Sequence, residues 1–193
     1  MTVPAINAVG FCANYSRPGD WAFEFAVKLA RRHDKRLNIF HFLTDPYDPQ
    51  DEGPAGLTGE QYRQFLIERE KELRLYYDAR LGDYLEAGFR LCEDNEWTEL
   101  HRCLYGREFQ VLILGVPEPA AVFAGRPIHE FAAGFACPLI LVGPGSPDEI
   151  YVNCPAALLA EQLGLPERQW QHISDESIVQ YSAPTANIAD RRV

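Results

Sequence analysis

The sequence lacks the long apolar stretches that mark membrane spans and secretion signals. Within its 193 residues, no apolar run approaches the roughly 18 residues that a membrane-spanning helix requires. The N-terminal stretch MTVPAINAVG contains neither a basic segment nor the apolar core of a signal peptide. We therefore expect a cytoplasmic protein that has no membrane as a partner.

Cysteine and histidine patterns that bind metals are also absent. The five cysteines are odd in number and scattered without a C-x-x-C pair, and the five histidines form no H-x-x-x-H motif. The sequence thus predicts reduced thiols, no disulfide framework and no metal site. Cys12, near the end of an apolar run, is expected to be a small buried apolar side chain and not a reactive thiol.

Basic residues are too few for nucleic-acid binding. The chain has 18 Lys and Arg against 28 Asp and Glu, a net charge of -10. The resulting negative potential repels DNA, RNA and anionic lipid. No basic cluster with interleaved aromatic residues offsets this field, so we expect no nucleic-acid partner.

The motifs of well-known enzyme classes on α/β sheets are missing. The sequence contains no G-x-S-x-G, no G-x-x-x-x-G-K-[ST] and no G-x-G-x-x-G. His129 and Glu130, adjacent on a predicted helix, are expected to face solvent and not to act as a catalytic pair. The sequence therefore predicts a protein that is not an enzyme.

What the sequence does contain is an alternation of strands and helices. The predicted strands are short apolar runs, typical of strands buried on both faces, at 8–13, 37–43, 89–92, 110–114 and 138–142. Between them lie helical patterns at 20–33, 58–88, 97–104 and 127–135, with Asp20 as the predicted first cap and Gly88 as the end of the second helix. This order predicts an α/β fold, a three-layer α/β/α sandwich with a five-stranded parallel sheet.

The composition changes after the fifth predicted strand, at Gly-Pro-Gly-Ser-Pro. We therefore predict one domain over residues 1–145 and a C-terminal extension over 146–193. A helix is predicted at 156–163, and the apolar residues that follow are too many for a fully solvated tail. The extension is expected to be partly helical and to pack on the domain or on a dimer partner.

Ligands of open parallel sheets bind beyond the carboxyl ends of the strands. Two loops at that edge resemble those of the universal stress protein family. Val9 to Ala13 match its first strand, Asn14 its Asp and Ser16 its Ser, while Leu114-Gly115, Gly125 and Cys137-Pro138 follow in the family's order. The resemblance covers about residues 5 to 142.

The resemblance implies the fold of the adenine-nucleotide alpha-hydrolase-like proteins and a homodimer, in which the last strand of the domain commonly lies at the interface. It also implies an adenine-nucleotide site for ATP or AMP, although the residues themselves leave the ligand unknown. The implied binding residues are Asn14, Ser16, Phe42, Leu114, Gly115, Gly125, Arg126 and Ile128.

The predicted phosphate loop departs from the family pattern. The segment from Gly115 to Gly125 is shortened, and Glu118 stands where a middle glycine is expected. Pro117 and Pro119 remove backbone N–H donors that a phosphate would need. Arg126, in place of a Ser or Thr, favours an anion instead.

Two hypotheses of function follow. The first is a regulatory or small-ligand-binding protein of the universal stress type, with altered or lost adenine-nucleotide binding and a small anionic ligand. The alternative is a protein–protein interaction module without a ligand, which acts on a protein partner through its C-terminal extension.

Overall fold

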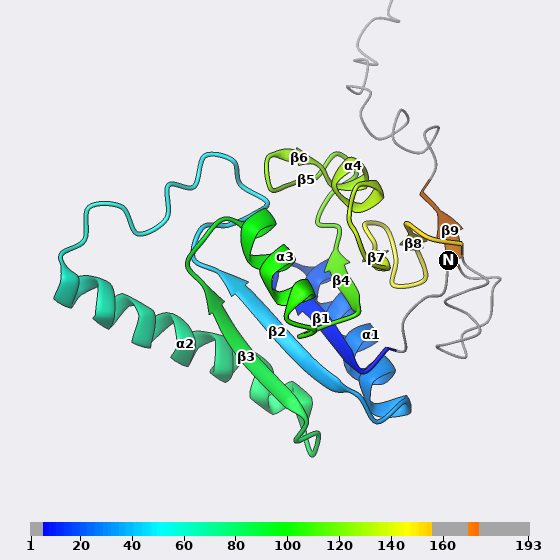
Figure 1. Cartoon of the computed structure of the whole chain (residues 1–193), viewed down its shortest axis with the longest axis horizontal. Coiled ribbons are helices and arrows are strands. Elements are labelled where there is room, and N and C mark those ends of the chain that lie inside the picture. The colour runs from blue at the N-terminus through cyan, green and yellow to red at the C-terminus, as the bar shows by residue number, and fades with distance from the viewer. Residues whose placement is uncertain (1–5, 156–169, 174–193) are drawn as a thin grey trace, which may run out of the picture.

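The computed structural model describes residues 6–155 and 170–173. Among these residues, seven strands form one sheet in the order β3-β2-β1-β4-β7-β8-β9 (Figure 1). Their bounds are Ala8–Cys12 (β1), Arg36–Phe42 (β2), Ala87–Cys92 (β3), Val111–Gly115 (β4), Leu139–Val142 (β7), Ile150–Val152 (β8) and Trp170–His172 (β9). The predicted α/β fold is confirmed.

The five predicted strands are the parallel part of this sheet, β3 to β7. The predicted strand number was wrong, because two strands lie C-terminal to residue 145. β8 pairs antiparallel with β7, and β9 pairs parallel with β8. The helix predicted at 156–163 lies outside the described residues. The sheet therefore continues into the part of the sequence that was predicted to be an extension.

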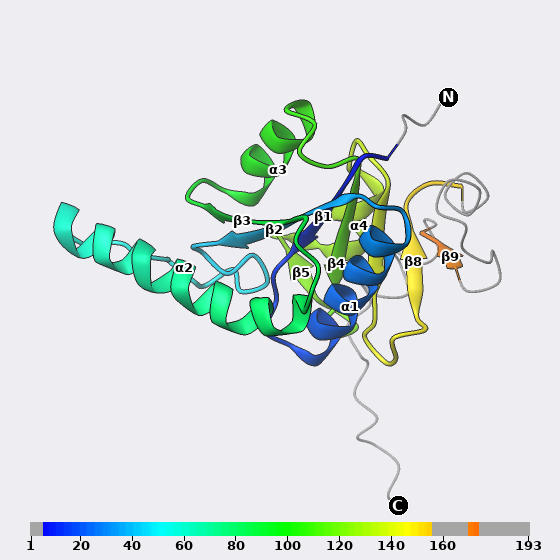
Figure 2. The same cartoon turned by 90° about the horizontal axis from the view of Figure 1, so that it is seen from below.

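Helices cover both faces of the sheet, as Figure 2 shows. Helices α1 (Arg17–Arg32) and α2 (Gly59–Leu81) pack on one face, and α3 (Glu96–Tyr105) and α4 (Ile128–Ala133) on the other. Adjacent strand residues alternate between two apolar clusters: Ile39 packs with α1 and α2, whereas Phe40 packs with α3 and α4. None of the described helices is long and apolar enough to span a membrane.

Two predicted helix boundaries were wrong. The N-cap of α1 is Ser16, whose hydroxyl accepts a hydrogen bond from the Gly19 N–H at 3.1 Å, and Asp20 lies inside the helix. Helix α2 begins after Thr58 as predicted but ends at Leu81, because Gly82 has a φ of 60°. Gly88, the predicted stop, lies within β3. Short-range sequence signals thus located the helices more reliably than their ends.

Helix α2 is longer than the part of the sheet that it covers. Its buried side chains, Leu73, Tyr77 and Leu81, all lie in its C-terminal half. The N-terminal half extends past the sheet (Figure 2), and the long loop that follows β2 runs above it in Figure 1. This geometry brings residues of α2 to the edge where β1 and β2 end.

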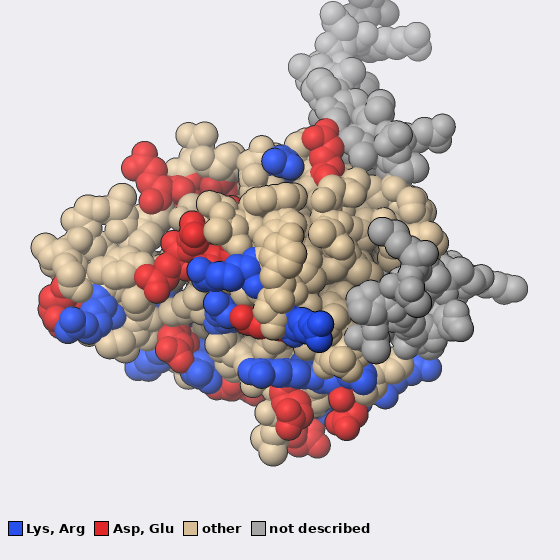
Figure 3. Space-filling view, in the orientation of Figure 1, with Lys and Arg blue, Asp and Glu red and all other residues tan. Residues whose placement is uncertain are grey.

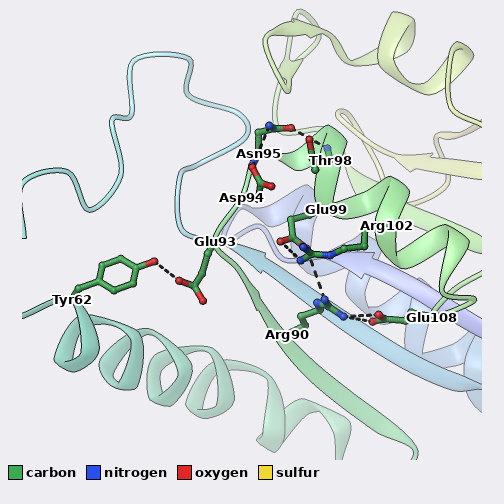
Figure 4. A network of polar contacts seen from close by, with 9 residues as sticks. All are labelled: Tyr62, Arg90, Glu93, Asp94, Asn95, Thr98, Glu99, Arg102 and Glu108. Atoms are coloured by element: carbon green, nitrogen blue, oxygen red, sulfur yellow. Dashed lines mark hydrogen bonds and ion pairs between the residues drawn. The ribbon is translucent and has the colours of Figure 1, made fainter. Parts of the chain in front are cut away.

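An ion network joins β3 to α3 on the opposite face of the sheet (Figure 4). Arg90 contacts both carboxylate oxygens of Glu108, at 2.5 and 2.6 Å, and lies 3.9 Å from Glu99. Glu99 also pairs with Arg102 and has a side chain only 4% exposed. Since a buried carboxylate without counter-charges is costly, this network supports the packing of α3.

The substitution Arg90→Met is expected to lower the free energy of unfolding by about 2 kcal/mol. It leaves the buried Glu99 with Arg102 as its one ion-pair partner and removes the ion pair of Glu108. The matched control is Arg63→Met, which removes an exposed pair with Glu60 and should cost less than about 0.5 kcal/mol. Urea unfolding of the three proteins measures both effects. Equal losses in the two variants would contradict a stabilising role of the network.

Charged side chains of both signs are interspersed on the face drawn in Figure 3, over α2, β3 and α3. Several Lys and Arg side chains lie close together in the middle and lower part of the view, and Asp and Glu side chains lie beside them. The surface above α4 and the β5–β6 segment is largely uncharged in the same view. Acidic side chains therefore accompany the basic ones on this face.

Candidate functional site

The sheet order reverses between β1 and β4. From β1 the chain moves outward to β2 and β3, and from β4 it moves the other way to β7. In open α/β sheets the ligand crevice lies outside the carboxyl ends of the strands at this point. The residues that close the ends of β1 and β4 therefore decide what this edge can bind.

Tyr47, from the loop after β2, lies across this crevice. Its hydroxyl donates a hydrogen bond to the carbonyl oxygen of Gly115 at the end of β4, at 2.9 Å. The side chain of Asn14, just beyond the end of β1, is close enough to influence the pKa of this hydroxyl. Its ring packs edge-on against Phe123, with 5.1 Å between ring centroids. Tyr47 thus packs over the end of β4, where the sheet order reverses.

The environment of Tyr47 keeps its hydroxyl protonated. Burial raises the pKa of Tyr47 well above its usual value, and the nearby Asn14 side chain opposes this only in part. A protonated hydroxyl can donate to Gly115 throughout the physiological pH range. The link across the crevice is therefore a neutral, pH-insensitive hydrogen bond.

Asn14 and Ser16, two of the implied binding residues, have partners within the chain. The amide oxygen of Asn14 accepts a hydrogen bond from the Ser16 N–H at 2.9 Å. The Ser16 hydroxyl caps α1. Both side chains thus shape the turn between β1 and α1.

The predicted phosphate loop is folded into a small hairpin that the sequence did not predict. It consists of β5 (Val122–Phe123) and β6 (Arg126–Pro127). The turn residues Ala124 and Gly125 have φ angles of 53° and 69°, as tight hairpin turns require. The Ala124 N–H donates to the Pro46 carbonyl at 3.0 Å. This loop is consequently bound to the segment that carries Tyr47.

The remaining predicted residues have structural surroundings. Leu114 is fully buried in the core, and the Ile128 N–H donates to the Ala121 carbonyl at 2.9 Å. Gly115 lies against α1, where a Cβ on it would meet backbone atoms of Gly19 at 2.7 Å. The Arg126 guanidinium lies 5.0 Å from the ring centroid of Trp97 on α3. None of these residues lines the cavity described next.

A cavity of about 390 Å³ opens beside the filled crevice, at the ends of β1 and β2. Of the predicted site residues, Asn14, Ser16 and Phe42 line it. Its other lining residues are Ala13, Tyr15, His41, Leu43, Asp45, Pro46, Asp51 and Arg69. The structure therefore brings three predicted residues together with a set that the sequence did not single out.

Arg69, Asp45 and Asp51 give the cavity its charge. Backbone hydrogen bonds from Asp45 and Gly53 lower the pKa of Asp51. Burial, and then the positive charge of Arg69, lower the pKa of His41 below its ordinary value. His41 is accordingly neutral at pH 7, and the cavity has one positive and two negative side chains.

Outside this cavity the described residues offer little chemistry. They contain no group of three His, Cys, Asp or Glu side chains placed to hold a metal ion. Burial raises the pKa of the Cys12 thiol well above its usual value, so the thiol stays protonated. His129, predicted to face solvent, is buried with its ring packed edge-on to Tyr151 of β8. It faces inward because β8 covers that side of α4.

The parallel sheet order and the position of the crevice place the domain among open α/β folds with a ligand edge. Its fold is that of the universal stress protein family. A family member from Burkholderia pseudomallei matches with a TM-score of 0.51 and 16% identity, over 73% of this chain and 98% of that one. A universal stress protein from Archaeoglobus fulgidus matches with a TM-score of 0.48 and 13% identity, over 69% and 96%.

No protein-family model matches the chain, and no curated protein matches it. At the identities found among solved structures, the likeness establishes the fold alone. The predicted resemblance to universal stress proteins is therefore confirmed as a resemblance of fold. Function has to be argued from the site.

Proposed function

We propose that the protein is a regulatory, small-ligand-binding domain of the universal stress type that has lost adenine-nucleotide binding. Tyr47 carries this proposal, because its hydroxyl is hydrogen-bonded to Gly115 at the end of β4, beside Asn14 at the end of β1. A nucleotide between these strand ends would have to displace the ring and break the hydrogen bond to Gly115. The adjacent cavity, with its net negative lining, would repel a triphosphate.

A binding role without turnover accords with the same geometry. The buried thiols of Cys12 and Cys92 have raised pKa values because of burial, which makes them poor nucleophiles. The cavity holds a neutral His41, but the described residues place no nucleophilic thiol in its lining. We propose that the protein binds a small ligand without converting it, and that other proteins recognise the bound state.

The test is calorimetric titration of the purified protein with ATP, ADP, AMP and cyclic AMP, together with native mass spectrometry of freshly purified protein. We expect no co-purified nucleotide and Kd values weaker than about 1 mM, equivalent to about 4 kcal/mol. The variant Tyr47→Ala, which opens the crevice, should not bind more weakly than the wild type. Its control is Tyr105→Ala, at an exposed tyrosine on α3. Micromolar binding of any of these nucleotides by the wild type would contradict the proposal.

An interaction module is the second candidate. One observation favours it: the sheet continues through β8 and β9, which lie C-terminal to residue 145. Among the described strands, β9 is therefore the last one at this edge. Edge strands are ready templates for a partner strand. If this function holds, capture of a protein partner should require residues 146–193, whereas the small-ligand function should not depend on a partner.

A further inference from the structure

We propose that the cavity at the ends of β1 and β2 binds a small zwitterion, a molecule with one carboxylate and one ammonium group and an apolar body, such as a free amino acid. The inference rests on the small-ligand function proposed above and assigns that ligand a chemical class. It follows from three properties of the cavity lining: opposite charges that do not pair, an aromatic and apolar wall, and a limited volume.

Opposite charges face this cavity without meeting across it. Arg69 pairs with Glu72 of its own helix at 2.8 Å, and its guanidinium lies 5.2 Å from the Phe65 ring centroid. Neither Asp45 nor Asp51 forms an ion pair with it within the described part of the chain. A ligand with both charges can therefore bridge groups that the protein leaves apart.

The two aspartates differ in the bonds that they already make. Asp51 accepts a backbone N–H on each oxygen, from Asp45 at 2.7 Å and from Gly53 at 2.9 Å. Asp45 accepts the Tyr47 N–H on Oδ1 alone, at 2.9 Å. Its second oxygen is thus the natural acceptor for an ammonium group. Arg69 pairs with Glu72 through Nη1, and the rest of its guanidinium can donate to a ligand carboxylate.

The rest of the lining suits an apolar body. Tyr15, 49% exposed, and His41 lie next to each other at the cavity, with ring centroids 5.7 Å apart. Ala13, Phe42, Leu43 and Pro46 complete the apolar part of the wall. Exposed aromatic rings at a cavity gain contact area when an aromatic or aliphatic group covers them.

Charge and size argue against other small ligands. Arg69, Asp45 and Asp51 together carry one negative charge, and Glu72, paired with Arg69, adds another beside the cavity. A simple anion is therefore disfavoured, whereas a ligand with its own ammonium group is not. The volume of about 390 Å³ is near the lower end of small-molecule sites, which begin at about 300 Å³. A single amino acid fits these limits better than a nucleotide.

The experiment uses three compounds that share a phenyl ring on a two-carbon chain: L-phenylalanine, 3-phenylpropanoate and 2-phenylethylamine. Calorimetric titration of the full chain should show binding of L-phenylalanine and at least tenfold weaker binding of the other two. If 2-phenylethylamine or 3-phenylpropanoate bound as tightly as L-phenylalanine, the zwitterion assignment would be overturned. It would also be overturned if none of the three compounds bound.

Two variants assign the charges. Arg69→Gln should weaken the binding of L-phenylalanine at least tenfold and leave the binding of 2-phenylethylamine unchanged. Asp45→Asn should weaken the binding of both compounds that carry an ammonium group. The matched control is Arg63→Gln, on the same helix and outside the cavity. Thermal melts of the unliganded variants show that each is folded. Failure of the zwitterion assignment is distinct from failure of the proposed function, which adenine-nucleotide binding by the wild type would contradict.

Discussion

Truncation of the chain after Gly145 is expected to lower the free energy of unfolding by more than about 5 kcal/mol and to make the remaining domain self-associate. The deletion removes β8, whose three side chains, Ile150, Tyr151 and Val152, are at most 5% exposed. Each such side chain contributes about 1.5 to 3 kcal/mol through burial. The total approaches the whole stability of a typical domain, about 5 to 15 kcal/mol.

The deletion also removes Asn153, which holds the connection between α4 and β7. Its side-chain oxygen accepts the Leu139 N–H at 2.8 Å, and its amide donates to the carbonyls of Ala132 and Cys137 at 2.8 and 3.0 Å. Unsatisfied buried backbone groups of this kind cost about 1 to 3 kcal/mol each. The edge of β7 would be exposed at the same time and available for pairing with a second chain.

Urea unfolding and light scattering after size-exclusion chromatography measure the two effects of this truncation. The control is truncation after Ile173, which keeps β8 and β9. If both truncations lower the free energy of unfolding by the same amount, the loss does not come from β8 and β9. A stable monomer after truncation at Gly145 would show that residues 6–145 form a complete unit without them.

This edge also bears on the predicted homodimer. The resemblance to universal stress proteins implies an interface at the last strand of the domain, which is β7 in this chain. Here β8 of the same chain pairs with that strand. A homodimer, which stays a prediction, would therefore need a surface other than the edge of β7.

The parallel core was predictable because its strands have a strong local signal. Each is an almost continuous apolar run between turn residues, as strands buried on both faces must be. The capping box at Thr58 was equally local, and its Gln61 oxygen accepts the Thr58 N–H at 2.9 Å. Strand β8 gave a weaker signal, because three apolar residues after a Gly- and Pro-rich turn do not distinguish a strand from a loop.

The site was harder to predict because its contacts are long-range. Tyr47 lies in a loop rich in turn residues, and nothing in that loop indicates a hydrogen bond to Gly115, 68 residues away. Arg69 lies at the cavity only because α2 extends past the sheet. Asn14, Ser16 and Phe42 were placed correctly at the strand ends, since their positions follow from the strands themselves.

The two glycines of the predicted phosphate loop should respond differently to substitution. Gly115→Ala is expected to lower the free energy of unfolding by about 3 kcal/mol, because its Cβ would lie 2.7 Å from backbone atoms of Gly19 and 2.8 Å from Pro18. The contacts are with backbone on both sides of a tight approach between β4 and α1, so the strain cannot be relieved by a side-chain rotation.

Gly125→Ala is the matched control. No atom lies within 4 Å of a Cβ at Gly125, and the positive φ of 69° is the sole penalty, worth about 1 to 2 kcal/mol. Urea unfolding should therefore rank Gly115→Ala as the more destabilised variant, with the hairpin variant closer to the wild type. The opposite order would contradict the close packing of β4 on α1. If glycine is retained at Gly115 for packing and at Gly125 for turn geometry, neither position requires a bound phosphate to explain it.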